Sequence, residues 1–275
     1  MSTLGGAVGR IPKLEHTGRV TQLRVMRSEW TKLRSVRSTG WSLFAAFAFT
    51  IGIPAIAAAV IRHHWPQMHP AEQANFHPVE VALSGVQLGQ LAIGVLGVLV
   101  ITAEYSTGMI RASMTAAPRR LPVLWGKGIV YAAVTWLLMT PAVLAGFFLS
   151  QWILSSRGIE THFTAAGVPR AVLGAGLYLT VIGIFGLGLG AIVRNTAGGI
   201  ATFAGLMFVL PPLMNVLPAS WNAAASPYLP LQAGEALLAL TRGNQLAPWT
   251  GFGVLCAYAA ASIAIAAVLL KRRDV

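Results

Sequence analysis

The chain has little of what soluble enzymes use for chemistry and for covalent stability. Only 10% of its residues are charged, eight residues are Asp or Glu, and Cys256 is the single cysteine. One cysteine excludes an internal disulfide and a cluster of thiolate metal ligands. The sequence also lacks the HExxH, GxSxG and GxxxxGK[ST] patterns, so no catalytic site and no ATPase site is predicted in this chain. We therefore expect a protein that is not itself an enzyme.

Long apolar segments are abundant instead. The composition is 55% hydrophobic and the mean hydropathy is +0.66. Six segments contain almost no charge, and each can cross a hydrocarbon core of about 30 Å as a helix. They span residues 41–61, 81–103, 128–154, 171–193, 197–217 and 250–270. We predict an all-α integral membrane protein with one transmembrane domain over residues 19–275, preceded by a disordered cytoplasmic tail over residues 1–18.

Positive charge is distributed unevenly between the two sides of this predicted bundle. Sixteen of the twenty Lys and Arg residues lie in the N-terminal segment, after the second and fourth spans, and at the C-terminus. Only Arg62, Arg157, Arg170 and Arg242 lie on the opposite side. The positive-inside rule then predicts a multi-pass protein with both termini in the cytoplasm. Anionic membrane lipid explains the formal net charge of +12, so nucleic acid is not an expected partner.

Two segments outside the spans are predicted to associate with the membrane. Residues 20–37 carry one apolar stripe with basic residues beside it, which is typical of an amphipathic helix at the interface. The stripe consists of Leu23, Met26, Trp30 and Leu33. The gap 218–249, between spans five and six, is too apolar for a free aqueous loop. We predict a re-entrant helical hairpin there, on the outer side.

The remaining loops offer weaker signals. Tyr105–Ala117 can form a short amphipathic helix that ends near Pro118, either as a plain surface helix or as a docking helix for a soluble partner. The gap 62–80 contains four histidines: His63, His64, His69 and His77. Their spacing matches no compact ligand pattern, so we predict no metal site, although metal binding stays an alternative.

No predicted span carries a charge near its centre, whereas ion-coupled transporters and proton relays usually need one. The uncharged polar residues of the spans could line a path for an amphipathic substrate or could pair between helices. They are Gln87, Gln90, Tyr131, Thr135, Tyr178, Thr202, Asn215, Tyr258 and Ser262. In the fourth span, Gly186 and Gly190 form a small-xxx-small step that allows close helix packing.

Four short motifs, in their order along the six spans, resemble the ABC-2 type transporter permeases, which are membrane subunits of bacterial ABC exporters. The motifs are Ser28–Ser35 (SEWTKLRS), Glu104–Arg111 (EYSTGMIR) with Ala117–Arg120 (APRR) and Lys127, Gly190–Gly198 (GAIVRNTAG), and Lys271–Asp274 (KRRD). The resemblance covers the chain from about residue 20. It implies a location in the bacterial cytoplasmic membrane.

The resemblance also implies partners and a coupling element. Two permeases, identical or homologous, would pair, and two ABC ATPase subunits would dock on the cytoplasmic side. ATP and Mg²⁺ would be bound by those ATPases, and no cofactor by this chain. Glu104, Gly108 and Arg111 would help to form the coupling element, with Pro118, Arg119 and Arg120 shaping its exit. The basic residues could instead serve only to orient the chain.

The leading hypothesis from the sequence is therefore a permease that exports an amphipathic molecule. Its cargo would be a peptide antibiotic, a drug or a lipid-like compound, which would connect the protein with efflux and antibiotic resistance. One alternative is an import or metal-related permease that uses the outer histidines. Another is a membrane sensor or scaffold that transports nothing. The sequence leaves open the cargo, the direction of transport and the choice between homodimer and heterodimer.

Overall fold

Residues 22–106, 120–241 and 243–272 are described by a computed structural model of the chain, and within these ranges they form helices and no strands. Six helical stretches are long and apolar enough to cross a membrane, which confirms the predicted number. They are Arg37–Gln67, Pro78–Tyr105, Leu121–Ser155, Val168–Val193, Thr196–Met214 and Pro248–Arg272. The first four and the sixth include the predicted segments entirely. The fifth ends earlier than predicted, because the chain turns before Pro218, which cannot continue a helix.

These stretches are built from the following elements. The first stretch consists of α2 (Arg37–His64) and η1 (Trp65–Gln67), and the second consists of α4 (Pro78–Leu83) and α5 (Gly85–Ser106). The third, fourth and sixth stretches are single helices: α7 (Arg120–Ser155), α8 (Val168–Val193) and α13 (Pro248–Arg272). The fifth stretch consists of α9 (Thr196–Ala204), η2 (Gly205–Val209) and α10 (Leu210–Met214). The shorter helices are α1 (Gln22–Ser35), α3 (Pro70–Ala74), α11 (Ala219–Ala225), η3 (Ser226–Tyr228) and α12 (Pro230–Glu235).

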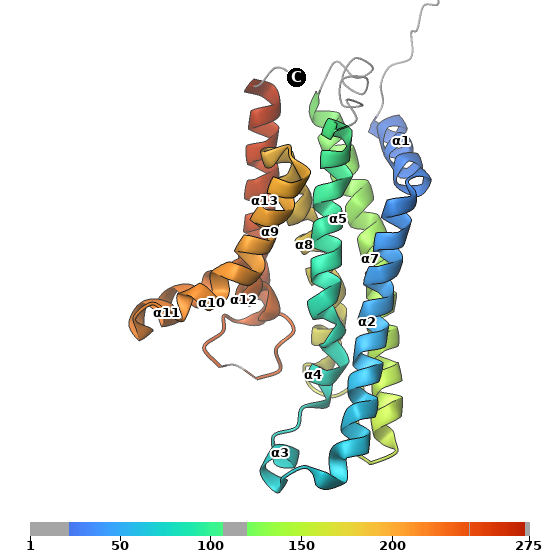
Figure 1. Cartoon of the computed structure of the whole chain (residues 1–275), viewed down its shortest axis with the longest axis vertical. Helices are drawn as coiled ribbons and strands as arrows, with labels where there is room; N and C mark the ends of the chain where they lie inside the picture. Colours follow the sequence, from blue (N-terminus) through green and yellow to red (C-terminus); the bar gives the residue numbers. More distant parts are fainter. Residues whose placement is uncertain (1–21, 107–119, 242, 273–275) are drawn as a thin grey trace, which may run out of the picture.

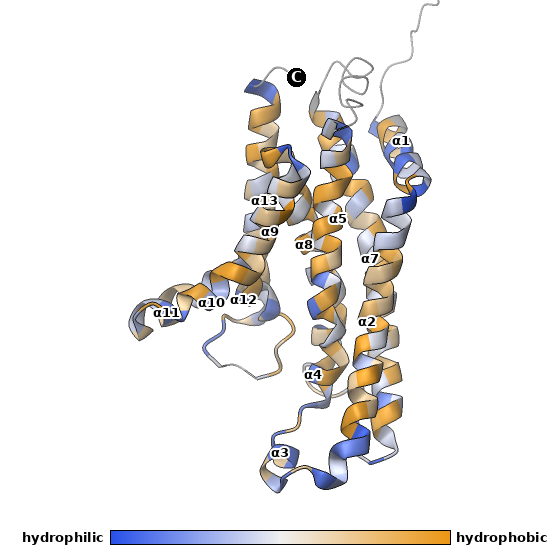
Figure 2. Cartoon of the chain, in the orientation of Figure 1, coloured by the Kyte–Doolittle hydropathy of each residue, from blue (hydrophilic) through white to orange (hydrophobic). Residues whose placement is uncertain are grey.

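The long helices run roughly parallel, and α1 lies at the same end of the bundle as the C-terminal end of α13 (Figure 1). We call this the terminal end, and the opposite end, which carries α3, the far end. Hydrophilic residues concentrate at both ends, and the middle of each long helix is hydrophobic (Figure 2). Helix α8 is central: it packs on α5, α7 and α13, and its apolar part is the most deeply buried of the six stretches.

Glycine determines how closely α5 and α8 approach each other. A Cβ atom added at Gly186 would lie 2.2 Å from the carbonyl oxygen of Gly94, and one added at Gly97 would lie 2.2 Å from that of Gly183. At Gly190 the nearest backbone oxygen, that of Val98, would be 2.9 Å away. The close packing predicted at Gly186 and Gly190 is confirmed, and α5 contributes matching glycines that the sequence analysis did not pair with them.

Helices α1 and α2 are separated by a single residue. Val36 has an extended backbone, with φ −87° and ψ 109°, and the helices on either side of it are continuous to Ser35 and from Arg37. Helix α1 packs on α7 and on the start of α2. The predicted helix over residues 20–37 is thus present, whereas its position at a membrane surface stays a prediction. Of its apolar stripe, Leu23 and Trp30 are more than half exposed.

The apolar gap between the fifth and sixth spans folds into short helices. Helices α10 and α11 turn away from the bundle axis, whereas α12 packs against α13 (Figure 1). Ala233 and Leu237 are fully buried, but Trp221 and Tyr228 are exposed. Arg170 of α8 donates hydrogen bonds to the carbonyl oxygens of Leu237 and Ala239, at 3.1 and 2.8 Å. Short helices thus occupy the gap, whereas the re-entrant hairpin and its insertion into a membrane stay predictions.

Candidate functional site

A cluster of four charged side chains joins three helices at the terminal end. Glu29 and Lys32 lie on α1, Glu104 lies near the end of α5, and Lys127 lies near the start of α7. The Nζ atom of Lys127 is 2.6 Å from Glu29 Oε2 and 3.0 Å from Glu104 Oε1. The Nζ atom of Lys32 is 2.7 Å from Glu29 Oε1 and 3.0 Å from the same Glu104 oxygen. We call these four residues the charge cluster.

Three members of the charge cluster are almost inaccessible to solvent. Glu29 is 3% exposed, Lys127 4% and Glu104 6%. Burial disfavours the ammonium form of Lys32, but hydrogen bonds to Glu29 and Glu104 outweigh this effect and raise the pKa of Lys32. The two positive and two negative charges balance one another. The loss of any one of the three buried members would leave a buried charge without compensation.

Local sequence explains why α1 can reach this position. Glu29 and Lys32 are three residues apart, so both project from the same face of the helix. Val25, one turn earlier, packs against Gly126 of α7, where an added Cβ would lie 2.9 Å from Val25 Cγ1. Gln22 donates a hydrogen bond from Nε2 to the carbonyl oxygen of Pro122 at 3.2 Å. The face of α1 that meets the bundle therefore combines polar and apolar side chains. Of the predicted apolar stripe, Met26 and Leu33 are half-buried, whereas Leu23 and Trp30 are exposed.

An apolar cavity of about 350 Å³ lies next to the charge cluster. Leu33, Leu96, Leu99 and Val100 form much of its wall, and all four cluster residues border it. A ligand or a moving side chain that entered this space would contact α1, α2, α5 and α7 together. The charge cluster is thus placed where a force on α1 reaches three spans.

A second junction at the terminal end involves the motif Gly190–Gly198. Arg194 ends α8 in a left-handed conformation, with φ 57°. Its Nη2 donates to the carbonyl oxygen of Leu269 at 3.2 Å, and its guanidinium carbon lies 5.4 Å from the ring centre of Tyr105. Asn195 caps α9 by accepting a hydrogen bond from the backbone nitrogen of Gly198 at 2.8 Å. This turn therefore joins the ends of α5, α8 and α13.

At the far end, three predicted pathway residues form a hydrogen-bond chain. The hydroxyl of Tyr178 donates to Gln90 Oε1, Gln90 Nε2 donates to Gln87 Oε1 at 2.9 Å, and Gln87 Nε2 donates to Glu235 Oε1 at 2.7 Å. Gln90 and Tyr178 are fully buried. Burial raises the pKa of the Glu235 carboxyl, and the hydrogen bond from Gln87 partly opposes this shift.

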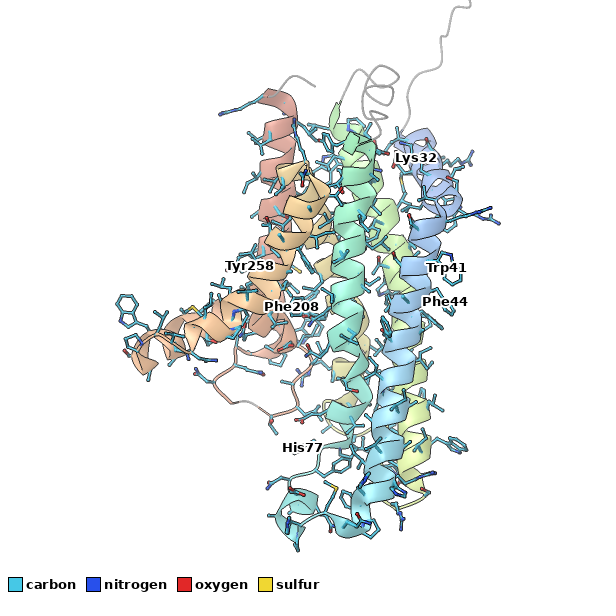
Figure 3. All side chains as sticks on the ribbon, in the orientation of Figure 1. Lys32, Trp41, Phe44, His77, Phe208 and Tyr258 are labelled. Carbon is cyan, nitrogen blue, oxygen red and sulfur yellow. The ribbon has the colours of Figure 1, made fainter. Side chains whose placement is uncertain are left out.

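The other predicted pathway residues lie elsewhere. Tyr131 is buried and donates from its hydroxyl to the carbonyl oxygen of Ile93 at 2.6 Å, which makes it an interhelical pair. Thr135 is also fully buried. Asn215 bonds with Asn222 on α11 at 3.1 Å, and Tyr258 packs edge-on against Phe185. Figure 3 labels Tyr258 on the side of the molecule formed by α9 to α13. Of the nine candidates, Gln87, Gln90 and Tyr178 belong to the hydrogen-bond chain, and the other six do not.

Most of the predicted coupling residues cannot be compared with the structure. Gly108, Arg111, Pro118 and Arg119 lie outside the described residues, as does the side chain of Arg120, which begins α7. Glu104 is the member that the structure places. Glu29, Lys32 and Lys127 were not predicted as its partners, because in the sequence they stand out only as members of the family motifs and as charges near the ends of the spans. The three-residue spacing of Glu29 and Lys32 was the available clue.

The histidines of residues 62–80 do not come together as ligands. The rings of His63 and His64 pack edge to face with centroids 5.0 Å apart, and His69 caps α3. Within the described ranges, no group of three or more His, Cys, Asp or Glu side chains is arranged to hold a metal ion.

Comparison of the sequence with protein-family models gives no match, and comparison with curated proteins gives none either. The functional argument therefore rests on the charge cluster, the cavity beside it and the six apolar helices.

Proposed function

We propose that the chain is the permease subunit of an ATP-driven exporter of the ABC-2 type, and that the charge cluster belongs to its coupling element. The observation that carries the proposal is the position of Glu104. It lies where the second span leaves the apolar region, and Lys127 and Lys32 connect it to the third span and to α1. A partner that moved α1 or the segment after Glu104 would change all of these contacts.

The outer surface of the bundle supports a membrane location. Trp41 and Phe44 on α2, and Trp136, Leu137 and Trp152 on α7, are large apolar side chains with exposed surface. Trp41 and Phe44 are labelled on the outward side of α2 in Figure 3. Such a surface is unfavourable in water and favourable against lipid. The basic terminal end would then face the cytoplasm and anionic lipid, as the charge distribution predicts.

In this proposal the ATPase activity belongs to a partner. Two ABC ATPase subunits would bind ATP and Mg²⁺, and two permeases would surround the path of an amphipathic cargo. Closure of the ATPases would push on the cytoplasmic segments, and the charge cluster would transmit the motion to α2, α5 and α7. The charge-balanced cluster suits this role because it can break and re-form without leaving a net charge behind.

Glu104→Ala tests the coupling role in the assembled complex. We expect the complex to purify with the same subunit ratio, while the cargo stimulation of ATP hydrolysis and the transport rate fall at least about tenfold, a range typical of coupling free energies. The physical reason is that Lys32 and Lys127 lose one of the two carboxylates that they share. Glu72→Ala, on α3 at the far end, is the matched control and should behave like the wild type. Unchanged stimulation and transport in Glu104→Ala would contradict the coupling role.

Co-purification tests the class of protein. The affinity-tagged chain, extracted with mild detergent from its native host, should bring down an ATP-binding subunit that hydrolyses ATP. Recovery of the permease alone, under conditions that keep other membrane complexes intact, would instead favour a sensor or scaffold that transports nothing.

A further inference from the structure

A cavity lies at the far end, away from the charge cluster. Its volume is about 630 Å³, within the range of sites that enclose drug-sized molecules. The apolar part of its wall includes Leu83, Val86, Leu238 and Leu240. The wall comes from α4, α5, α8, α12 and the segment that follows α12, so both early and late parts of the chain enclose the space.

The charged side chains that line this cavity, among the described residues, are both acidic: Glu80 and Glu235. Within the described part of the chain, no Lys or Arg lies within ion-pair distance of Glu235. The guanidinium group of Arg170 is directed elsewhere, to the carbonyl oxygens of Leu237 and Ala239. Within the described residues, the cavity therefore combines an apolar wall with negative charge that has no basic partner, and a cation that entered it would gain a counter-ion.

The hydrogen-bond chain points toward the carboxylate. Tyr178 donates to Gln90, Gln90 donates to Gln87, and Gln87 donates to Oε1 of Glu235. The three hydrogen bonds therefore have the same direction, and the carboxylate of Glu235 is the last acceptor. Such a chain fixes the side-chain orientation and strengthens each of its bonds. Oε2 of Glu235 accepts no hydrogen bond from the described residues. That oxygen is consequently available to a ligand.

We propose that this cavity binds amphipathic cations, with Glu235 as the counter-ion and the leucine-rich wall around the apolar part of the ligand. The inference deepens the proposed function and rests on it for the role of the cavity as a cargo site. An anionic ligand would be repelled by both carboxylates. A neutral lipid would bury apolar surface but would gain nothing from Glu235. A free inorganic cation would leave the apolar wall unused.

The test uses a matched pair of fluorescent probes and the full chain in lipid nanodiscs. Dansylcadaverine carries a hydrophobic fluorophore and a primary amine that is protonated at neutral pH, and N-acetyl dansylcadaverine is its neutral counterpart. We expect saturable binding of the amine above the signal of empty nanodiscs, and binding of the acetylated probe that is at least about tenfold weaker. Glu235→Gln should weaken binding of the amine at least about tenfold and leave the acetylated probe unchanged.

Three variants complete the design. Glu72→Gln lies at the same end outside the cavity and should bind both probes as the wild type does. Thr241→Trp, at an exposed position of the cavity wall, should obstruct binding of both probes. Arg242 lies outside the described residues but follows Thr241, so Arg242→Gln is also made. It should bind the amine at least as tightly as the wild type.

Several results would overturn the proposal: equal affinity of the wild type for the two probes, unchanged amine binding by Glu235→Gln or Thr241→Trp, or a loss in Arg242→Gln as large as that in Glu235→Gln. The nanodisc samples contain no ATPase subunit. Failure of the permease to pair with an ATPase would therefore leave a positive binding result standing, and a negative binding result would leave the coupling test at Glu104 unaffected.

Discussion

Replacement of Lys127 by Met is expected to lower the free energy of unfolding by about 3–5 kcal/mol, the usual cost of removing one partner from a buried ion pair. Lys127 donates to Glu29 at 2.6 Å and to Glu104 at 3.0 Å. Without it, two buried carboxylates share the single ammonium group of Lys32. The measurement is unfolding of the purified chain by sodium dodecyl sulfate in mixed micelles, followed by circular dichroism.

The double variant Lys127→Met with Glu29→Gln separates the effect of charge from the effect of shape. It leaves Lys32 paired with Glu104, so the net charge of the cluster returns to zero. We expect the double variant to recover most of the stability that Lys127→Met loses. Lys271→Met, an exposed lysine near the end of α13, serves as the control and should change stability by less than about 0.5 kcal/mol. A double variant that is no more stable than Lys127→Met would show that the loss is not electrostatic.

Gly186→Ala is expected to destabilise the bundle by about 1–3 kcal/mol or more, because even one methyl group overpacks the contact between α5 and α8. The added carbon would lie 2.2 Å from the carbonyl oxygen of Gly94 and 3.0 Å from its carbonyl carbon. These are backbone atoms of a neighbouring helix, so a change of side-chain rotamer cannot relieve the clash. Thermal unfolding in detergent, with the yield of monodisperse protein, measures the effect.

Gly253→Ala is the matched control for this substitution. Gly253 also lies within a spanning helix, α13, but no atom comes within 4 Å of a Cβ built there. The change should leave the stability unchanged or raise it by up to about 1 kcal/mol, since alanine favours a helix more than glycine does. Equal losses at Gly186 and Gly253 would contradict the close approach of α5 and α8.

The six long helices were predictable because a run of about twenty apolar residues is typical of a helix that crosses a membrane. The end of the fifth span was less predictable, since apolar residues continue past Met214 while the backbone already turns before Pro218. The matching of Gly94 and Gly97 on α5 with the glycines of α8 depends on the rotation of two helices about their axes. Hydropathy contains no information about that rotation.

The candidate site was predictable only in part, and for a related reason. Glu104 stood out because an acidic residue at the predicted cytoplasmic end of a span does not help to orient the chain. Lys127 and Lys32 were ambiguous, because a basic residue in the same region has a sufficient explanation in topology. Similarly, Gln87, Gln90 and Tyr178 could be identified as polar groups within spans, but Glu235 belongs to a segment of uncertain fold. Its place beside Gln87 follows from the packing of α12 on the bundle.

The single-residue joint at Val36 determines what happens when α1 leaves the charge cluster. One residue contributes two soft backbone torsions, so α1 can swing about the start of α2 but cannot diffuse away. Its return is a unimolecular event, with the high local concentration that a very short tether provides. Departure of α1 would break the two ion pairs that join it to the other helices, Lys32–Glu104 and Lys127–Glu29, and these two pairs would re-form rapidly. The joint makes α1 suited to repeated dissociation from the charge cluster and rebinding to it, with the same bound position at the start of each cycle.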